Sequence, residues 1–202
     1  MLEAFNQHRG KVAVLPNANV DTDQIIPKQF LKRIEKSGFG DVLFYDWRYD
    51  EKGQPRPEFV LNHPESQGAS ILLAGDNFGC GSSREHAVWA LRDYGFRAIL
   101  ARSFADIFYN NCFKNGVLPV VLSEEAWDGL EPIRQGVLRE LEVDLPGEVI
   151  RLPDGKSFSF TLAAHAKMML MEGLDDVGVT LRHQQKIDRY ELYHRVAYQR
   201  VY

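Results

Sequence analysis

The residues best suited to chemistry form one short run, which reads Gly79-Cys80-Gly81-Ser82-Ser83-Arg84-Glu85-His86. Glycine takes a positive φ readily, so Gly79 and Gly81 let backbone N–H groups approach a ligand closely. A helix that begins near Ser83 adds unpaired N–H groups and the positive end of its dipole. Together with the Arg84 guanidinium, these groups favour a carboxylate, a phosphate or an alkoxide. The run therefore predicts an anion site.

Ser82 has two alternative roles in this run. With Glu85 it matches the capping box, in which Ser82 caps the helix and Glu85 bonds back to its N–H. As a general base Ser82 would act as an alkoxide, and lowering a hydroxyl pKa by about six units takes roughly 8 kcal/mol. Charge-assisted hydrogen bonds contribute about 1.5–3 kcal/mol each, so several donors must act together. Loop N–H groups and Arg84 can provide them, and both roles remain open on these residues alone.

The known nucleotide and hydrolase motifs do not match the run. A Walker loop counted from Gly75 would need glycine at Cys80, and a G-x-G-x-x-G counted from Gly79 would need glycine at Arg84. The sequence also contains no G-x-S-x-G motif. Nucleotide binding and serine hydrolysis therefore lose support.

Composition sets the broad class of protein. The chain has 202 residues, which is long enough for one domain with a sizeable core, and a formal net charge of −4. Its charges are mixed in sign and give no footprint for nucleic acid or a membrane surface. Without a signal-peptide stretch or an apolar run long enough to cross a bilayer, we expect a cytoplasmic protein. Cys80 and Cys112 form no C-x-x-C motif and are expected to be free thiols.

The elements that position the run follow a β-α-β-α-β pattern. Apolar runs predict strands, and periodic apolar spacing predicts the helices between them. The predicted order is a strand at 70–74, a helix at 84–94, a strand at 97–101, a helix at 104–114 and a strand at 118–122. This alternation predicts an α/β fold.

Weaker signals predict the remaining elements. Before the core we expect a strand at 11–15, a polar loop at 17–24, a helix over 28–36 and a loop-rich stretch at 46–69 with a short strand at 59–61. After the core we expect a helix to about 135, a β-rich stretch at 137–162 and a helical tail over about 163–202. A stripe in that tail either covers the core or contacts a partner, and it comprises Ile187, Tyr190, His194, Ala197 and Val201.

Three stretches of the chain together resemble a known family. They are the run at 79–86, an upstream stretch Asn19-Val20-Asp21-Thr22-Asp23-Gln24-Ile25-Ile26-Pro27 and a downstream stretch Arg102-Ser103-Phe104-Ala105-Asp106-Ile107-Phe108. In this order they closely resemble the small subunits of 3-isopropylmalate dehydratase, which belong to the aconitase superfamily. The resemblance extends over about residues 1–195, and the 46–69 segment resembles the longer bacterial form.

The resemblance implies a fold, a reaction and a partner. The fold is a swivelling β/β/α domain, like the mobile C-terminal domain of aconitase, that spans residues 1–202 and pairs with a large subunit. The reaction interconverts 2-isopropylmalate and 3-isopropylmalate through isopropylmaleate in leucine biosynthesis, so the substrate is a small dicarboxylate. In that family the large subunit carries a [4Fe–4S] cluster that acts on the leaving hydroxyl. Such a cluster needs three or four thiolates, so we expect this chain to bind no metal or cofactor.

The resemblance also assigns roles within the run. Ser82 is implied as the base that removes a proton beside a carboxylate. Arg84 is implied as the clamp on a substrate carboxylate, because its planar fork suits that anion, and Ser83 and Gly81 are implied as further contacts. Cys80 is expected to be a thiol that lines the loop, and Cys112 a buried packing residue.

A second segment is implied to select the substrate, and it reads Lys28-Gln29-Phe30-Leu31-Lys32-Arg33. Phe30 and Leu31 would contact the isopropyl group, and Lys28 and Lys32 are the basic candidates for a carboxylate, with a solvated surface as the alternative for Lys32 and Arg33. Four residues are expected to support the site from outside, namely Asp21, Thr22, Glu85 and His86. For Asp21 we expect a turn or cap, and for His86 a structural role.

Two other functions stay open at this point. One is a small subunit for a neighbouring substrate, such as homoaconitate or a methylmalate/citraconate-type acid. The other, from a different class, is a stand-alone anion-binding or regulatory module that uses the same loop without chemistry.

Overall fold

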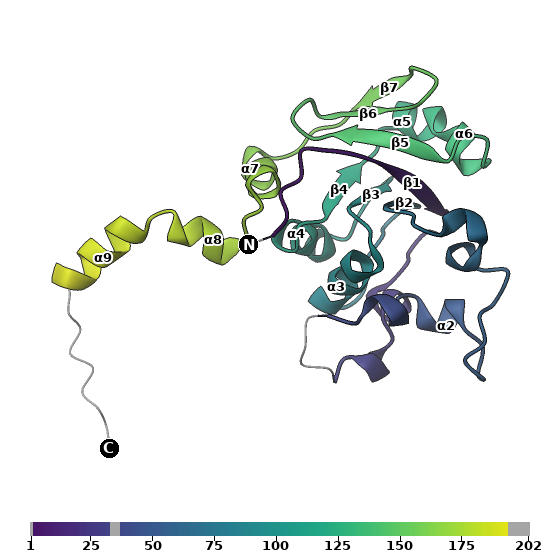
Figure 1. Ribbon diagram of the computed structural model, residues 1–202, viewed down its shortest axis with the longest axis horizontal. Coiled ribbons are helices and arrows are strands. Elements are labelled where there is room, and N and C mark those ends of the chain that lie inside the picture. The colour runs from purple at the N-terminus through teal and green to yellow at the C-terminus, as the bar shows by residue number, and fades with distance from the viewer. Residues whose placement is uncertain (1, 33–36, 194–202) are drawn as a thin grey trace.

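A single sheet organises the chain (Figure 1). The computed structural model describes residues 2–32 and 37–193, and within them the strands lie in the order β4-β3-β2-β1-β5-β6-β7. Their bounds are β1 Gln7–Leu15, β2 Ile71–Ala74, β3 Ala98–Ala101, β4 Leu118–Val121, β5 Glu140–Asp144, β6 Val149–Arg151 and β7 Ser157–Ser159. The first strand of the chain therefore lies at the centre of the sheet.

Strand β1 belongs to two half-sheets. Its second half pairs in parallel with β2, with Val12 opposite Ile71, and its first half pairs antiparallel with β5, with Gln7 opposite Asp144. Parallel pairing continues through β3 and β4, and antiparallel pairing continues through β6 and β7. Strands β2 and β3 are buried throughout, as expected of a parallel sheet covered on both faces.

Helices cover both faces of the parallel half. Alternate strand residues point to opposite faces, so Leu72 and Ala74 join one hydrophobic cluster and Ile71 and Leu73 join the other. The first cluster includes side chains of α1 (Thr22–Ile25), α3 (Glu85–Tyr94) and α4 (Asp106–Lys114). The second includes side chains of α5 (Glu124–Gly129), α6 (Glu131–Arg134) and α7 (Ala164–Glu172). The predicted β-α-β-α-β core and the α/β fold class are confirmed.

The long connection between β1 and β2 is made of short elements. Its described residues form α1, α2 (Tyr45–Arg48) and four 3₁₀ turns, at Lys28–Phe30, Gly40–Val42, Val60–Asn62 and Pro64–Ser66. The predicted strand at 59–61 is therefore wrong, because Asn62 and His63 donate hydrogen bonds to residues three positions earlier instead of to a strand. The predicted helix over 28–36 is reduced to one 3₁₀ turn in its described part, and residues 33–36, including Arg33, lie outside the described residues.

Two further boundaries differ from the prediction. The helix expected up to residue 135 is divided into α5 and α6, because Pro132 has no N–H with which to continue the hydrogen-bond ladder. Strand β1 begins earlier than expected, at Gln7, because its polar first half pairs with β5. The β-rich stretch is confirmed, with β6 and β7 joined by a turn in which Gly155 has a φ of +90°.

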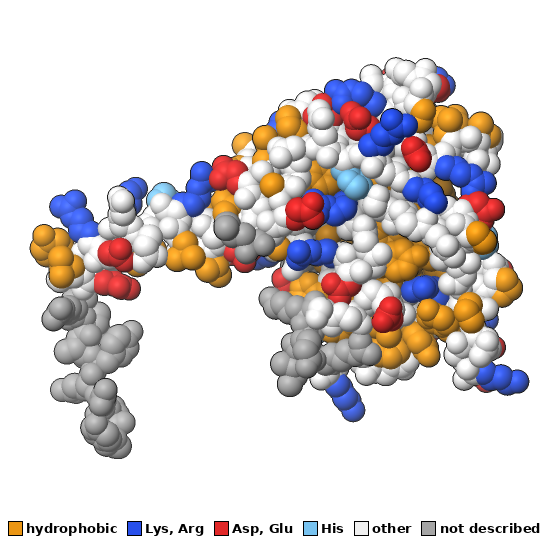
Figure 2. Space-filling view, viewed as in Figure 1, with side chains coloured by type: hydrophobic (Ala, Val, Ile, Leu, Met, Phe, Trp, Pro, Cys, Tyr) orange, Lys and Arg blue, Asp and Glu red, His pale blue; other side chains and the backbone are white. Residues whose placement is uncertain are grey.

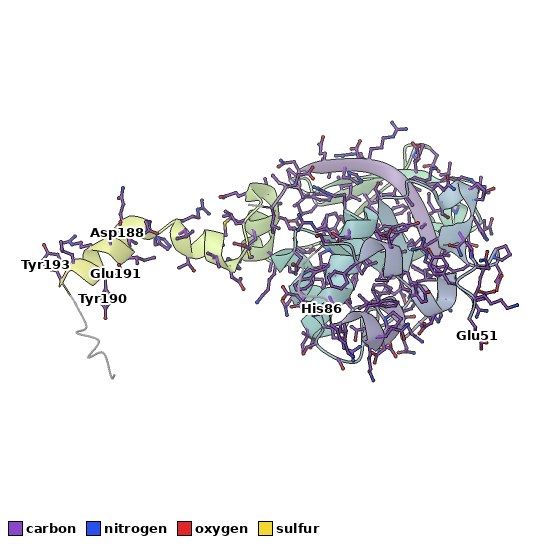
Figure 3. All side chains as sticks on the ribbon, turned by 60° about the horizontal axis from the view of Figure 1, so that its bottom comes forward. Glu51, His86, Asp188, Tyr190, Glu191 and Tyr193 are labelled. Atoms are coloured by element: carbon purple, nitrogen blue, oxygen red, sulfur yellow. The ribbon has the colours of Figure 1, made fainter. Side chains whose placement is uncertain are left out.

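The C-terminal helices leave the body of the molecule. Helices α8 (Asp176–Leu181) and α9 (Gln184–Tyr193) contain no buried side chain, and Figure 1 shows them extending away from the sheet. Figure 2 shows hydrophobic side chains along this tail, and Figure 3 places Tyr190 and Tyr193 near its end. The tail stripe therefore does not cover the core in its described part, and His194, Ala197 and Val201 lie outside the described residues. Within the described residues, no helix is long and apolar enough to cross a membrane.

Candidate active site

Three chain connections meet at the carboxyl ends of β1, β2 and β3. The Gly79 N–H donates to the Val20 carbonyl at 2.8 Å, which ties the glycine run to the segment after β1. The Phe78 N–H donates to the Ser103 carbonyl at 3.0 Å and the Phe78 carbonyl accepts from the Ala105 N–H at 3.1 Å, which ties it to the segment after β3. In open α/β sheets this edge is where ligands bind. The three stretches that carry the family resemblance are thus brought together here.

The two glycines of the run have the predicted positive φ, at +77° for Gly79 and +88° for Gly81. Their surroundings differ. A Cβ at Gly79 would lie 2.1 Å from Cγ of Phe108, whereas a Cβ at Gly81 would lie 3.5 Å from its nearest neighbour, Cβ of Asp21. Gly79 is therefore required by space as well as by backbone conformation, and Gly81 by conformation alone.

Asp21 and Thr22, at the start of α1, help to fix the backbone of the run. Thr22 is buried; its N–H donates to the Cys80 carbonyl at 2.9 Å and its hydroxyl donates to the Ser82 carbonyl at 3.0 Å. Asp21 caps α1 by accepting from the Gln24 N–H, while the Gln24 side chain accepts from the Asp21 N–H. The expected capping role of Asp21 is confirmed, and Thr22 fixes the backbone on both sides of Gly81.

Ser82 does not cap α3. The helix begins at Glu85, and Arg84 occupies the cap position without a side-chain hydrogen bond to the helix. The Arg84 N–H donates to the Ser82 carbonyl at 2.8 Å, so the chain turns once more between the serines and the helix. Ser82 and Ser83 are exposed, and neither hydroxyl has a hydrogen-bond partner among the residues that the structure describes. The capping-box interpretation is therefore wrong, and the serine hydroxyls stand beside the helix start.

Glu85 and His86 secure the start of α3. The Glu85 carboxylate accepts from the Asn115 side-chain amide at 2.9 Å, and the amide oxygen of Asn115 accepts from the Trp89 indole N–H at 2.9 Å. The His86 ring, labelled in Figure 3, lies 5.5 Å from the Phe39 ring and 4.6 Å from the Trp89 ring, between centroids. Glu85 therefore supports the start of α3 by a hydrogen bond and His86 by packing, in line with the structural role expected for His86.

Asp23 connects the run at 79–86 to the second predicted segment. The Arg84 side chain is only 15% exposed and forms an ion pair with Asp23, whose other carboxylate oxygen lies 3.6 Å from Nζ of Lys28. The Arg84 hydrogen bond, with the nearby cationic charges of Arg84 and Lys28, lowers the pKa of Asp23. Asp23 was not among the residues predicted for the site. The only sequence signal for a role of Asp23 in the site was its place in the stretch 19–27, because its contact with Arg84 forms only in the folded chain.

A pocket of about 230 Å³ opens beside the run. One wall is formed by the run and by Thr22, and the other by the start of α4; the lining residues are Thr22, Gly79, Gly81, Ser82, Arg84, Ala105, Asp106, Ile107 and Phe108. Of the residues predicted for the site, the pocket brings together Thr22, Gly81, Ser82 and Arg84. Helices α3 and α4 both begin at this edge of the sheet, so the positive ends of their dipoles face it.

The second predicted segment does not line this pocket. The Phe30 ring packs edge-on against the Tyr45 ring, 4.9 Å between centroids, and Leu31 is half-buried against the first hydrophobic cluster. Lys28 and Lys32 are exposed, and Lys28 reaches the pocket only through Asp23. Ser83 is likewise exposed beside the pocket and absent from its lining.

Neither cysteine has the surroundings of a reactive or metal-binding thiol. Cys112 is buried in the first cluster, as expected, and burial raises its pKa. Burial and the Asp21 charge raise the pKa of Cys80, so this thiol stays protonated near neutral pH. Across residues 2–32 and 37–193, no group of three or more His, Cys, Asp or Glu side chains could hold a metal ion.

Comparison with known proteins identifies the family to which the chain belongs. A model of the aconitase C-terminal domain family matches residues 2–125. The chain is also 53% identical over 190 residues to the 3-isopropylmalate dehydratase small subunit of Bacillus subtilis (strain 168), which covers 94% of this chain and 96% of that protein. The chain belongs to the family of 3-isopropylmalate dehydratase small subunits.

A solved structure of similar shape supports the fold of this family member. The crystal structure of 3-isopropylmalate dehydratase from Methanocaldococcus jannaschii superposes with a TM-score of 0.66 at 24% identity, over 91% of this chain and 98% of that one. The predicted likeness to the C-terminal domain of aconitase is therefore confirmed at the level of the fold.

Proposed function

We propose that this chain is the small subunit of a 3-isopropylmalate dehydratase, a hydro-lyase of leucine biosynthesis. The reaction converts 2-isopropylmalate to 3-isopropylmalate through isopropylmaleate. One observation carries the proposal: the exposed Ser82 hydroxyl, which has no partner among the described residues, shares a pocket with Arg84 at the start of two helices. Such a pocket suits a substrate that is an anion and must lose a proton from carbon.

Each residue of the run then has a part in the reaction. Ser82 takes the proton from the carbon beside a carboxylate, and Arg84 holds that carboxylate, with Ser83 and the N–H groups around Gly81 as additional donors. Because Arg84 is held by Asp23, its fork is already oriented before the substrate arrives. Thr22 and Asp21 keep the backbone of the run in place, and Glu85 and His86 keep the start of α3 in place.

The second segment completes substrate recognition in this proposal. Lys28 shares Asp23 with Arg84, which gives a second cation within reach of a distal carboxylate. Phe30 and Leu31 present apolar side chains on the same segment for the isopropyl group, and Lys32 adds a further basic side chain at its edge.

The proposal places the remaining chemistry on a partner. The described residues of this chain do not fit a [4Fe–4S] cluster, and the whole sequence holds two cysteines. The cluster therefore belongs to a large subunit, where it would polarise the leaving hydroxyl. This chain then acts as one swivelling domain over residues 1–202 in a cytoplasmic hetero-oligomer.

Anaerobic turnover of 3-isopropylmalate tests the proposal, with the chain alone and mixed with the cluster-bearing large subunit. The release of isopropylmaleate is followed. We expect turnover only in the mixture, and Ser82→Ala should lower it by about 10²–10⁴-fold, the usual contribution of a general base, while the subunits still associate. The control is Ser157→Ala, an exposed serine of β7 far along the chain from the run.

Three results would contradict parts of the proposal. Substantial turnover by Ser82→Ala would remove Ser82 as the base. Preference for a straight-chain triacid over 3-isopropylmalate would make homoaconitate-type acids the better substrate class. Tight binding of a small anion by the isolated chain, with no turnover in the mixture, would favour a stand-alone binding module.

A further inference from the structure

One side chain of the pocket is not explained by the folding of the helix that carries it. Helix α4 packs through Phe108, Cys112 and Phe113, which are buried, and its exposed side carries Asp106, Asn110 and Lys114. Ile107 lies next to these polar residues with 55% of its side chain exposed. A single exposed apolar side chain is ordinary on a protein surface, so what sets Ile107 apart is its place in the lining of the pocket that also holds Ser82 and Arg84.

The pocket has a polar wall and an apolar wall, and Ile107 belongs to the second. Ser82 and Arg84 belong to the polar wall, and the start of α4 contributes the apolar residues Ala105, Ile107 and Phe108 together with the acidic residue Asp106. The Phe108 ring is almost fully buried against Gly79, and Ala105 offers one methyl group. Ile107 is therefore the large apolar side chain of this lining that a bound molecule can touch.

The other apolar candidates lie elsewhere. Phe30 and Leu31 are half-buried against the first cluster, and neither lines the pocket. Since Arg84 and Ile107 line the same pocket, a molecule whose carboxylate binds Arg84 there has Ile107 among the side chains around it. Any alkyl branch on the carbon skeleton that points away from Arg84 would meet this side chain.

We infer that Ile107 is a specificity-determining residue, which forms the apolar wall against the branched alkyl group of the substrate. The inference rests on the proposed function and adds to it a second contact for that group, on an element other than the segment 28–32. An alkyl group in an apolar site contributes about 10-fold or more to kcat/KM for each carbon that is well enclosed. Since Ile107 is half open, the total effect should lie at the low end of that scale.

Kinetics with two substrates test this inference on the complex with saturating large subunit. The value of kcat/KM is measured for 3-isopropylmalate and for 3-methylmalate, whose smaller alkyl group reaches the wall less. We expect Ile107→Ala to lower kcat/KM for 3-isopropylmalate about 10-fold and to change it less than about 2-fold for 3-methylmalate, with Ile107→Val between the two. The control is Val137→Ala, because Val137 is 73% exposed and lies outside the pocket lining.

The outcomes separate this inference from the function on which it rests. No turnover of 3-isopropylmalate by the unmodified complex refutes the proposed function, and the inference with it. Normal turnover with an equal loss for both substrates in Ile107→Ala refutes the inference alone, because the residue would then act on the pocket as a whole. Weaker subunit association with an unchanged ratio of the two kcat/KM values also refutes it, since Ile107 would then be an interface contact.

Discussion

Replacing Gly79 by alanine tests how tightly the glycine run is packed. Two costs add at this position. An L-residue at a φ of +77° costs about 1–2 kcal/mol, and a Cβ placed 2.1 Å from Cγ of Phe108 overpacks the site by about 1–3 kcal/mol. The Phe108 ring has little room to retreat, because it lies 5.4 Å from the Phe78 ring and 6.4 Å from the Phe104 ring, between centroids. The expected loss of stability is therefore about 2–5 kcal/mol.

Gly81→Ala is the matched control for that measurement. Its φ of +88° is similar, but its Cβ would make only an ordinary contact at 3.5 Å, so the cost is the backbone part alone, about 1–2 kcal/mol. At about 2–4 °C per kcal/mol for a chain of this size, Tm should fall by roughly 4–20 °C for Gly79→Ala and roughly 2–8 °C for Gly81→Ala. Thermal and urea unfolding of the two variants give the comparison. Equal losses in both would refute the packing argument, since only Gly79 has a ring against it.

Two further changes probe a buried carboxylate and the cation of the pocket. The Gly147 N–H and the Arg151 guanidinium bond to Asp144, and these bonds lower its pKa, so Asp144→Asn should cost about 1–2 kcal/mol at pH 7. The pKa of Asp144 is lower in the folded chain than in the unfolded chain. Its contribution to the free energy of unfolding is therefore complete above about pH 4 and is lost as the pH falls through the pKa of the folded chain. Urea unfolding at pH 7 and pH 3 should therefore show a larger difference at pH 7 than at pH 3; the exposed turn variant Asp154→Asn is the control, and a difference that does not shrink at pH 3 would contradict the reasoning. Arg84→Lys should lower kcat/KM for 3-isopropylmalate roughly 10–150-fold, because an ammonium cannot pair with Asp23 and grip a carboxylate as the fork does; a loss below about threefold would show that Arg84 is not the clamp.

Local patterns predicted the core of the fold and the backbone of the run. Strands such as 71–74 are continuous apolar stretches, and glycine at 79 and 81 signals a positive φ at a tight turn. Both features depend on neighbours in sequence, which is why they were predictable. The break between α5 and α6 at Leu130 also had a local signal, which is Pro132. The proline did not by itself indicate whether the helix would end there or continue with a kink.

Tertiary contacts account for what the sequence did not reveal. The capping-box spacing at Ser82 is satisfied in sequence, yet Thr22 holds the Ser82 carbonyl and Arg84 takes the cap position. Asp23 becomes important only because residue 84 lies beside it. In the same way, helical periodicity predicted the tail, but nothing in a period of 3.6 residues states whether the helix packs on the body or leaves it.

The central position of β1 has a consequence for synthesis on the ribosome. This strand is made first, but both of its neighbours are made later, and Asp144, which pairs opposite Gln7, follows roughly 7–27 seconds behind it at about 5–20 residues per second. Until then the nascent chain carries a nine-residue strand with an unpaired edge, which is a template for association with other chains. The first half of β1 carries polar residues, among them His8, Arg9 and Lys11. Because charged side chains on an unpaired strand oppose association, we expect these residues to limit aggregation of the nascent chain during translation.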